Sequence, residues 1–199
     1  MKAWITADWH LGESRFELMG RPFKTDIEHA EALVANHNQL VAPDDEVIVA
    51  GDVCYQKTPE WLKHVSLFHG KKTLLRGNHD RVFTDEQLAP YFDKIIPEGE
   101  GIEITAGSLR CYVTHYPTEG VKGLFNLVGH VHAAWKYQLN MLNVGVDVHH
   151  FRPVDLNTIS FHLNAIVQYY DRDVWVAYNE LNDSYKESRG KAGTYFRPV

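Results

Sequence analysis

Residues 73–80 read Thr-Leu-Leu-Arg-Gly-Asn-His-Asp, and this stretch decides the fold class because a strand leads directly into chemically active side chains. Thr73–Leu75 reads as a strand that is apolar on both faces, as expected where other layers cover a sheet. The Gly77–Asp80 tetrapeptide that follows offers amide, imidazole and carboxylate groups. Composition alone predicts this tetrapeptide about 0.003 times in a chain of this length. Its position directly after a strand therefore indicates a functional site.

Short apolar runs and amphipathic patterns alternate along the rest of the chain. The further predicted strands are Ala3–Ala7, Val47–Ala50, Cys111–Thr114, Asn126–Val128 and Leu142–Val146. The predicted helices are Ile27–Val41, Pro59–Phe68, a short helix from Thr84 to Phe92, and a helix from Asp155 to about Tyr170. Gly107-Ser108 separates Ile102–Ala106 from Leu109–Thr114, which predicts a hairpin. The alternation indicates an α/β chain whose core is rich in sheet.

The predicted strands end in a common set of polar side chains. In the order of the strands, these are Asp8 with His10, Asp52, Asn78, His115, and His130 with His132. Ligands gather beyond the carboxyl ends of the strands in open α/β sheets, so we expect these residues to share one edge. Carboxylate, imidazole and amide oxygen together form the donor set of divalent first-row metals. The pattern therefore predicts a metal site.

The order of these motifs resembles that of the calcineurin-like metallophosphoesterase superfamily, which is D-x-H, G-D, G-N-H-[DE], H and G-H-x-H, here over residues 8 to 132. Asn143–Asp147 with Pro153 resembles the closing strand and turn of small stand-alone bacterial and phage members. The resemblance implies a four-layer α/β/β/α sandwich, which we place in residues 1–170. Residues 171–199 are polar and weakly patterned, and we expect an appendage there rather than a separate domain.

The resemblance implies two divalent ions per chain, with manganese as the first choice and iron, zinc, nickel or magnesium as alternatives. One ion would have Asp8, His10, Asp52 and His132 as ligands, and the other would have Asp52, Asn78, His115 and His130. A water that bridges two such ions becomes a hydroxide that attacks the phosphoryl group. His79 matches the catalytic histidine and would act as general acid, with Asp80 as its orienting carboxylate.

Departures from the superfamily pattern indicate which branch of the superfamily the sequence resembles. Protein Ser/Thr phosphatases extend the second motif to G-D-x-x-D-R-G and use G-N-H-E as the third, whereas residues 51–57 here read Gly-Asp-Val-Cys-Tyr-Gln-Lys and Asp80 ends the third. Repair nucleases of the superfamily carry capping domains, for which 199 residues leave little room. We therefore expect a hydrolase of small or nucleotide-type phosphomonoesters or phosphodiesters. The alternatives are a non-enzymatic protein-binding module on the same fold and a small nuclease.

Charge and cysteine content limit the partners and the compartment. The 20 basic and 26 acidic residues give a net charge of −6, which argues against duplex nucleic acid or an anionic membrane as the partner. No apolar run approaches membrane-spanning length. Cys54 and Cys111 are the only cysteines, and a reduced pair is the better reading, so we expect a cytoplasmic location.

Several other charged and titratable residues have weaker signals. Arg76 precedes the Gly-Asn-His-Asp motif, and it would either grip a substrate phosphate oxygen or be a solvated surface arginine. Arg15 and Arg21 follow the first motif and would either line the substrate side or be exposed charges, and exposed charge is the better reading for both. Cys54 is expected to be a small buried hydrophobe. Packing or solvent contact is expected for His29, His37, His64, His69, His149, His150 and His162.

Overall fold

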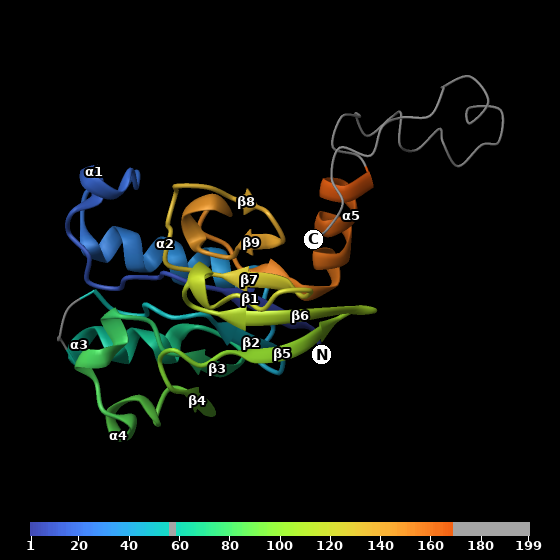
Figure 1. Cartoon of the computed structure of the whole chain (residues 1–199). Helices are drawn as coiled ribbons and strands as arrows, with labels where there is room; N and C mark the ends of the chain where they lie inside the picture. Colours follow the sequence, from blue (N-terminus) through green and yellow to red (C-terminus); the bar gives the residue numbers. More distant parts are fainter. Residues whose placement is uncertain (56–58, 169–199) are drawn as a thin grey trace, which may run out of the picture.

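Two five-stranded sheets stack face to face in this protein (Figure 1). The structure is a computed structural model that describes residues 1–55 and 59–168. The first sheet has the order β10 (Val154–Asp155), β1 (Ala3–Thr6), β2 (Glu46–Val49), β3 (Lys71–Leu75) and β4 (Lys94–Ile96). Strands β1 to β4 run parallel, and β10 pairs antiparallel with β1. The carboxyl ends of β1, β2 and β3 therefore meet at one edge.

The second sheet supplies further carboxyl ends. Its order is β5 (Ile102–Ala106), β6 (Leu109–Thr114), β7 (Phe125–Val128), β9 (Met141–Asn143) and β8 (Tyr137–Gln138). Strands β6, β7 and β9 are parallel neighbours, while β5 and β6 form the predicted hairpin. An isolated parallel bridge joins Ala7 to Gly145, so the first sheet touches the second just beyond the end of β1.

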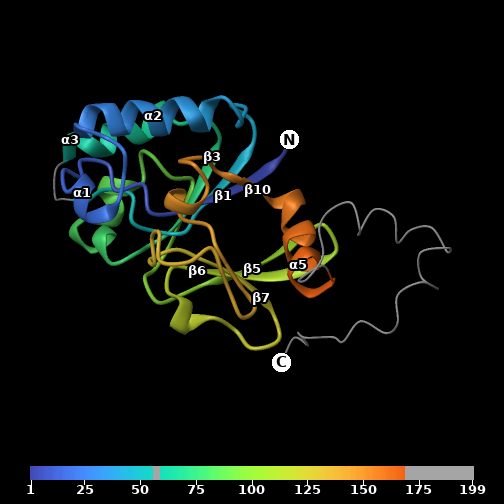
Figure 2. The same ribbon diagram turned by 90° about the horizontal axis from the view of Figure 1, so that it is seen from above.

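Helices flank the sandwich. They are α1 (Phe16–Met19), α2 (Asp26–Asn38), α3 (Pro59–Leu62), α4 (Asp85–Leu88) and α5 (Ile159–Gln168). Short 3-10 turns complete the chain at η1 (Lys63–Leu67), η2 (His79–Val82), η3 (Pro117–Glu119), η4 (Val146–Val148) and η5 (Leu156–Thr158). In Figure 2, α2 and α3 lie on the side of the first sheet that faces away from the second, and α5 lies at one end of the sandwich. No helix in residues 1–55 and 59–168 is long and apolar enough to cross a membrane.

The first sheet is buried on both faces, as its apolar strands predict. Trp4 of β1 packs into the core between this sheet and the helices, while its neighbour Ile5 packs into the core between the two sheets. Leu74 and Leu75 of β3 divide in the same way. Fully burying a large apolar side chain stabilises the fold by roughly 1.5–3 kcal/mol. Both layers therefore fix the positions of the strand ends.

The predicted two-sheet α/β architecture is confirmed, and the differences are local. Pro59–Phe68 is not a continuous helix, because Leu62, Val65 and Phe68 are all buried and their three-residue spacing suits the 3-10 turn η1. The helix after Thr84 has both predicted capping-box bonds but ends at Leu88, since Pro90 has no backbone N–H with which to continue the helical hydrogen bonds. Asp155 caps the C-terminal segment as predicted. The predicted appendage of residues 171–199 lies outside the described residues.

Candidate metal centre

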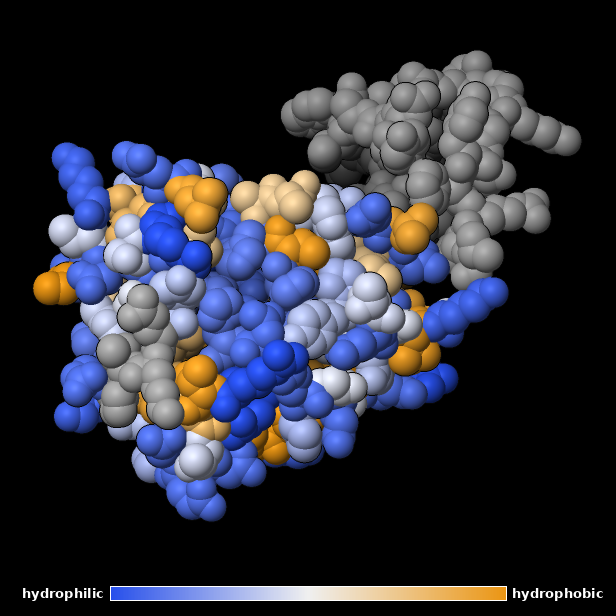
Figure 3. Space-filling model, turned by 60° about the vertical axis from the view of Figure 1, so that its left-hand side comes forward, coloured by the Kyte–Doolittle hydropathy of each residue, from blue (hydrophilic) through white to orange (hydrophobic). Residues whose placement is uncertain are grey.

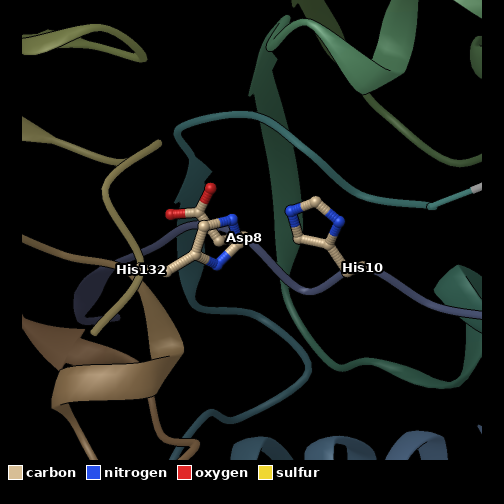
Figure 4. Close-up of side chains that lie close together, drawn as sticks. All are labelled: Asp8, His10 and His132. Carbon is tan, nitrogen blue, oxygen red and sulfur yellow. The ribbon is translucent and has the colours of Figure 1, made fainter. Parts of the chain in front are cut away.

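The seven predicted metal ligands meet at the shared carboxyl edge of the two sheets. Six of the seven, together with His79, form three groups whose potential ligand atoms lie within 4.8 Å of one another, which are Asp8–His10–His132, His10–Asp52–His79 and Asp52–His115–His130. Figure 4 shows Asp8 and His10 on the segment after β1 and His132 on a separate segment, with the three side chains close together. The face of the molecule at this edge is hydrophilic at its centre, with scattered hydrophobic patches around it (Figure 3).

Asp52 connects the groups. Its Oδ2 lies 3.5 Å from His10 Nε2 and 3.4 Å from His115 Nε2, so one carboxylate oxygen faces imidazoles on both sides. Asn78 belongs only to the group of His115 and His130, because its Oδ1 lies 3.3 Å from His115 Nε2 and 3.1 Å from His130 Nδ1. The arrangement is that of two neighbouring sets of donors with Asp52 between them.

His10 shows that the donors fit a metal ion. The residue is only 1% exposed, yet neither of its ring nitrogens has a hydrogen-bond partner in the described part of the chain. Buried polar groups in native proteins are almost always hydrogen-bonded, so an unpaired imidazole calls for an explanation. Burial lowers the pKa of His10 to about 4 against the opposing effect of Asp52, which keeps the ring neutral at pH 7. A neutral imidazole is the form that binds metals.

The electrostatics of the cluster keep Asp52 ionised. Burial would raise the pKa of Asp52, but contacts with His10 and His115 outweigh burial and hold this pKa well below its usual range. Burial works against the charged form of His115, but Asp52 and Asp8 raise its pKa to about 9. Burial raises the pKa of Asp8 to about 6. The carboxylates are thus available as ligands at neutral pH.

The backbone at this edge is strained at the proposed ligands. Five of them have positive φ angles, which are 60° at Asp8, 49° at His10, 58° at Asp52, 71° at His130 and 48° at His132. Each residue of this kind costs on the order of 1–3 kcal/mol, and such residues cluster at functional sites. The strained turns direct the side chains into one space immediately after each strand, which indicates function rather than stability.

Two motif glycines make the close approach possible. A Cβ at Gly77 would lie 2.2 Å from Asp52 Oδ1. A Cβ at Gly51 would lie 2.4 Å from His115 Nδ1, and the φ of Gly51 is +92°. Only glycine combines this backbone freedom with the absence of a side chain. The glycines of the G-D and G-N-H-D motifs therefore allow Asp52 and His115 to reach the centre.

His79 and Asp80 have separate structural roles. The buried Asp80 carboxylate accepts hydrogen bonds from the backbone N–H groups of Asp52 at 2.9 Å, Val53 at 3.0 Å and Gly77 at 2.9 Å. The family resemblance predicts that Asp80 orients His79, whereas in the structure the carbonyl of Tyr55 lies 3.2 Å from His79 Nδ1. The difference arises because the turn after β2 leaves buried N–H donors that need an acceptor. Asp80 thus holds the loop that carries Asp52.

Comparison with known proteins identifies the family. The family model for calcineurin-like phosphoesterases matches residues 1–161. The chain belongs to the calcineurin-like phosphoesterase family. It is therefore a phosphoric ester hydrolase of a metal-dependent family, and its His and Asp groups are able to bind metal.

Solved structures agree with this phosphoesterase fold. A protein of unknown function from Aquifex aeolicus is 20% identical, with 81% of this chain and 98% of that chain covered and a TM-score of 0.63. Weaker likenesses are a novel archaeal phosphodiesterase (18% identity, 73% and 82% covered, TM-score 0.41) and a phosphopantetheinyl hydrolase from Mycobacterium tuberculosis (18%, 58% and 42%, 0.29). None of the curated proteins compared with the chain matches it. The first likeness supports the fold, and none of the three bears on the substrate.

Arg76 of the phosphoesterase contacts groups of the chain itself. Its side chain is only 14% exposed, so it is not a solvated surface arginine. The guanidinium donates hydrogen bonds to the carbonyl of Phe83 at 3.0 Å and to Asp85 Oδ1 at 2.5 Å. These bonds tie the end of β3 to the segment that begins α4. Arg76 is therefore engaged in local structure.

Arg21 and Asp147 are residues that the sequence analysis missed. Arg21 was expected to be exposed, which is wrong, because its side chain is fully buried and forms a salt bridge of 2.8 Å with Asp147 Oδ1. Asp147 Oδ2 in turn lies 3.1 Å from His132 Nδ1. Arg21 and Asp147 are 126 positions apart in the sequence, so no local pattern links them. The signal for Asp147 was its D-x-H spacing with His149, which composition alone made unremarkable.

Two aromatic side chains border the centre. Arg15 lies 4.1 Å from the ring centroid of Tyr55, and the buried Glu13 holds the guanidinium through two of its nitrogens. Tyr116 contacts the rings of His115 and His130 and donates a 2.6 Å hydrogen bond to Glu98. Tyr55 and Tyr116 therefore lie directly beside the clustered histidines.

Most of the remaining expectations hold. Cys54 and Cys111 are free and buried, and burial raises the pKa of both thiols. The ring of His149 packs inside the fold with Nε2 2.7 Å from the carbonyl of Asn143. His37 is buried with Nε2 3.0 Å from the carbonyl of His69. These side chains have structural roles.

Proposed function

We propose that this phosphoesterase hydrolyses small or nucleotide-type phosphate esters, monoesters or diesters, with two divalent ions per chain. The observation that carries the proposal is the placement of Asp52 between two groups of metal-binding side chains. Asp8, His10, Asp52 and His132 would hold one ion, and Asp52, Asn78, His115 and His130 would hold the other. Nitrogen and oxygen donors of this mixture suit manganese, iron, zinc or nickel, and we propose manganese.

Bound ions would supply Lewis-acid stabilisation of the phosphoryl oxygens and would lower the pKa of water. The chain itself has to place the substrate and to protonate the leaving group. His79 is the residue we assign to proton transfer, because the Tyr55 carbonyl engages its Nδ1 and leaves Nε2 for the leaving-group oxygen. An imidazole is the side chain that best donates a proton near neutral pH. Asp80 acts on Asp52 through the backbone and is a positioning residue.

The charge of the chain supports a small substrate. With a net charge of −6, the protein gains little from neutralising many phosphates at once. The guanidinium of Arg15 is one cation beside Tyr55, whose carbonyl orients His79. A single phosphate group with an aromatic or sugar leaving group matches this arrangement better than a duplex does. We propose that duplex nucleic acid is not a substrate.

Metal analysis combined with a hydrolysis assay tests the proposal. Protein reconstituted with excess Mn²⁺ should approach two ions per chain and hydrolyse bis-p-nitrophenyl phosphate or p-nitrophenyl phosphate. Asp52→Asn should lose more metal than His10→Ala, because Asp52 contacts both groups. Asp45→Asn is a matched control, since Asp45 is also buried but lies at the start of β2, at the opposite end of that strand from Asp52. A ceiling of one ion at saturation would contradict the dinuclear site.

A further inference from the structure

Arg21 lies next to the Asp8–His10–His132 group, which is one half of the metal centre. It contacts three groups that hold this half in place. The guanidinium donates hydrogen bonds to the carbonyl of Asp8 at 2.7 Å and to the carbonyl of Trp9 at 3.0 Å. It also binds both carboxylate oxygens of Asp147, at 2.8 and 2.9 Å. Its side chain has no exposed surface. A buried guanidinium with this many partners fixes the groups around it.

The carbonyls that Arg21 holds belong to the strained turn after β1. Asp8 and His10 have φ angles of 60° and 49°, and Trp9 is the residue between them. Strained backbone persists only where surrounding contacts determine it. The hydrogen bonds from Arg21 to Asp8 and Trp9 are contacts of this kind, so Arg21 helps to hold both side chains in place.

Asp147 extends the same support to the third member of the group. Its Oδ2 lies 3.1 Å from Nδ1 of His132, so the ring N–H donates a hydrogen bond to the carboxylate. The bond leaves Nε2 of His132 as the nitrogen that faces the centre. A histidine that binds a metal through one nitrogen is commonly oriented by a carboxylate at the other, and loss of such a partner typically lowers metal affinity by 10–100-fold.

The other half of the centre is held by different groups. Nδ1 of His115 lies 2.7 Å from the carbonyl of Ala50. The loop that carries Asp52 is held by Asp80. In the described part of the chain, neither Arg21 nor Asp147 makes a hydrogen bond to His115, Asn78 or His130. The orienting contacts of His115 and of the Asp52 loop are therefore separate from those of Arg21 and Asp147, and the halves meet where the backbone N–H of His130 donates to the Asp8 carboxylate at 3.1 and 3.0 Å.

We propose that Arg21 and Asp147 are positioning residues that set the metal affinity of the Asp8–His10–His132 half and leave the other half unchanged. The inference rests on the proposed dinuclear function. It predicts that Asp147→Asn, which keeps the shape of the side chain but removes its charge, lowers the affinity for one of the two ions by about 10–100-fold. The affinity for the second ion should stay within about threefold of wild type.

A Mn²⁺ titration followed by electron paramagnetic resonance of the free ion measures both affinities without an activity assay. The control is Asp45→Asn, because Asp45 is a buried aspartate that accepts hydrogen bonds from Lys2 N, Trp4 Nε1 and Ala42 N. This control should lower thermal stability and keep both affinities. If Asp147→Asn fails to fold, Arg21→Lys replaces it, since lysine keeps the positive charge but cannot reach the two carbonyls and both carboxylate oxygens together.

The outcomes separate the inference from the function on which it rests. Loss of one affinity in Asp147→Asn, with both kept in Asp45→Asn, supports the inference. Unchanged affinities, or equal loss of both, overturn it. A wild-type protein that binds a single ion contradicts the dinuclear proposal instead. In that case long-range ¹H–¹⁵N spectra of the metal-free protein test the inference. The inference requires that Nδ1 of His132 carries a proton and that Asp147→Asn changes the signal of this nitrogen.

Discussion

Replacing Gly77 with alanine tests whether the centre depends on the close approach of Asp52 to the backbone after β3. A Cβ at this position would lie 2.2 Å from Asp52 Oδ1 and 2.8 Å from both Asp52 N and His115 Cε1. Since real Cβ atoms essentially never approach closer than 3.0 Å, the carboxylate has to move by roughly 1 Å. Metal sites tolerate shifts in ligand distance of about 0.2 Å. Gly77→Ala should therefore displace Asp52 from its position between the two groups.

The size of the effect follows from that displacement. A misplacement of about 1 Å costs on the order of 100-fold in rate, so kcat/KM for bis-p-nitrophenyl phosphate with saturating Mn²⁺ should fall roughly 100-fold. Overpacking should also cost about 1–3 kcal/mol of stability. Both metal affinities should weaken, because Asp52 contacts both groups.

Gly120→Ala is the matched control for this substitution. Its nearest neighbour would be the flexible end of Met141 at 2.9 Å, and its φ of −58° is open to any residue. This variant should keep its activity within about threefold of wild type. If Gly77→Ala binds two Mn²⁺ ions with wild-type affinity and keeps its activity, the reasoning about the approach of Asp52 is refuted.

Three further substitutions test the roles of single residues. His79→Asn should keep its metal and still hydrolyse the nitrophenyl ester, but lose about 10²–10⁴-fold on an alkyl ester whose leaving group needs a proton; equal losses on both esters would exclude a general acid. Arg15→Gln should raise KM about tenfold with little change in kcat, because Glu13 binds Nε and Nη2 of Arg15 and leaves Nη1 without a partner among the described residues, free for a substrate phosphate. Arg110→Gln is the control, because the ion pair of Arg110 with Glu103 is exposed. An unchanged KM in Arg15→Gln would show that Arg15 does not contact the substrate. Burial lowers the pKa of His37 to about 4, so the stability that this residue contributes is present above pH 6.5 and declines as the pH falls toward 4. Between pH 6.5 and 5, the free energy of unfolding of metal-free His37→Gln, measured with urea, should therefore fall by roughly 2 kcal/mol less than that of the wild type. Equal pH dependence of the two proteins would contradict the assignment.

Local sequence pattern was enough to predict an α/β chain and the position of the ligands, whereas the sandwich architecture was predicted from the family resemblance. Strand ends are marked by a change from apolar to polar residues, and parallel strands bring those ends to one edge. Asp8, Asp52 and His115 could therefore be placed together before any contact was known. The end of the helix after Thr84 was missed by four residues because the effect of Pro90 was not weighed.

Contacts between distant polar groups could not be predicted in this way. Arg21 has the same local appearance as an exposed arginine, and only the packed fold shows that Asp147 and the carbonyls of Asp8 and Trp9 surround it. The same holds for Asp80, whose three partners are backbone N–H groups on two different loops. Backbone groups carry no sequence signal, so bonds to them are invisible until the turn geometry is known.

The two halves of the centre are supported by different kinds of group, and Asp52 is the residue that couples them. On one side a buried guanidinium holds two carbonyls and a carboxylate, and on the other the carbonyl of Ala50 orients His115. Asp80 fixes Asp52 through the backbone rather than through a side chain, so the carboxylate of Asp52 stays available to both sides. A change in one support can therefore alter one set of donors alone, whereas a change at Asp52 or at Gly77 reaches both. The strain at five of the proposed ligands is compatible with a stable fold because the side chains that support them are buried.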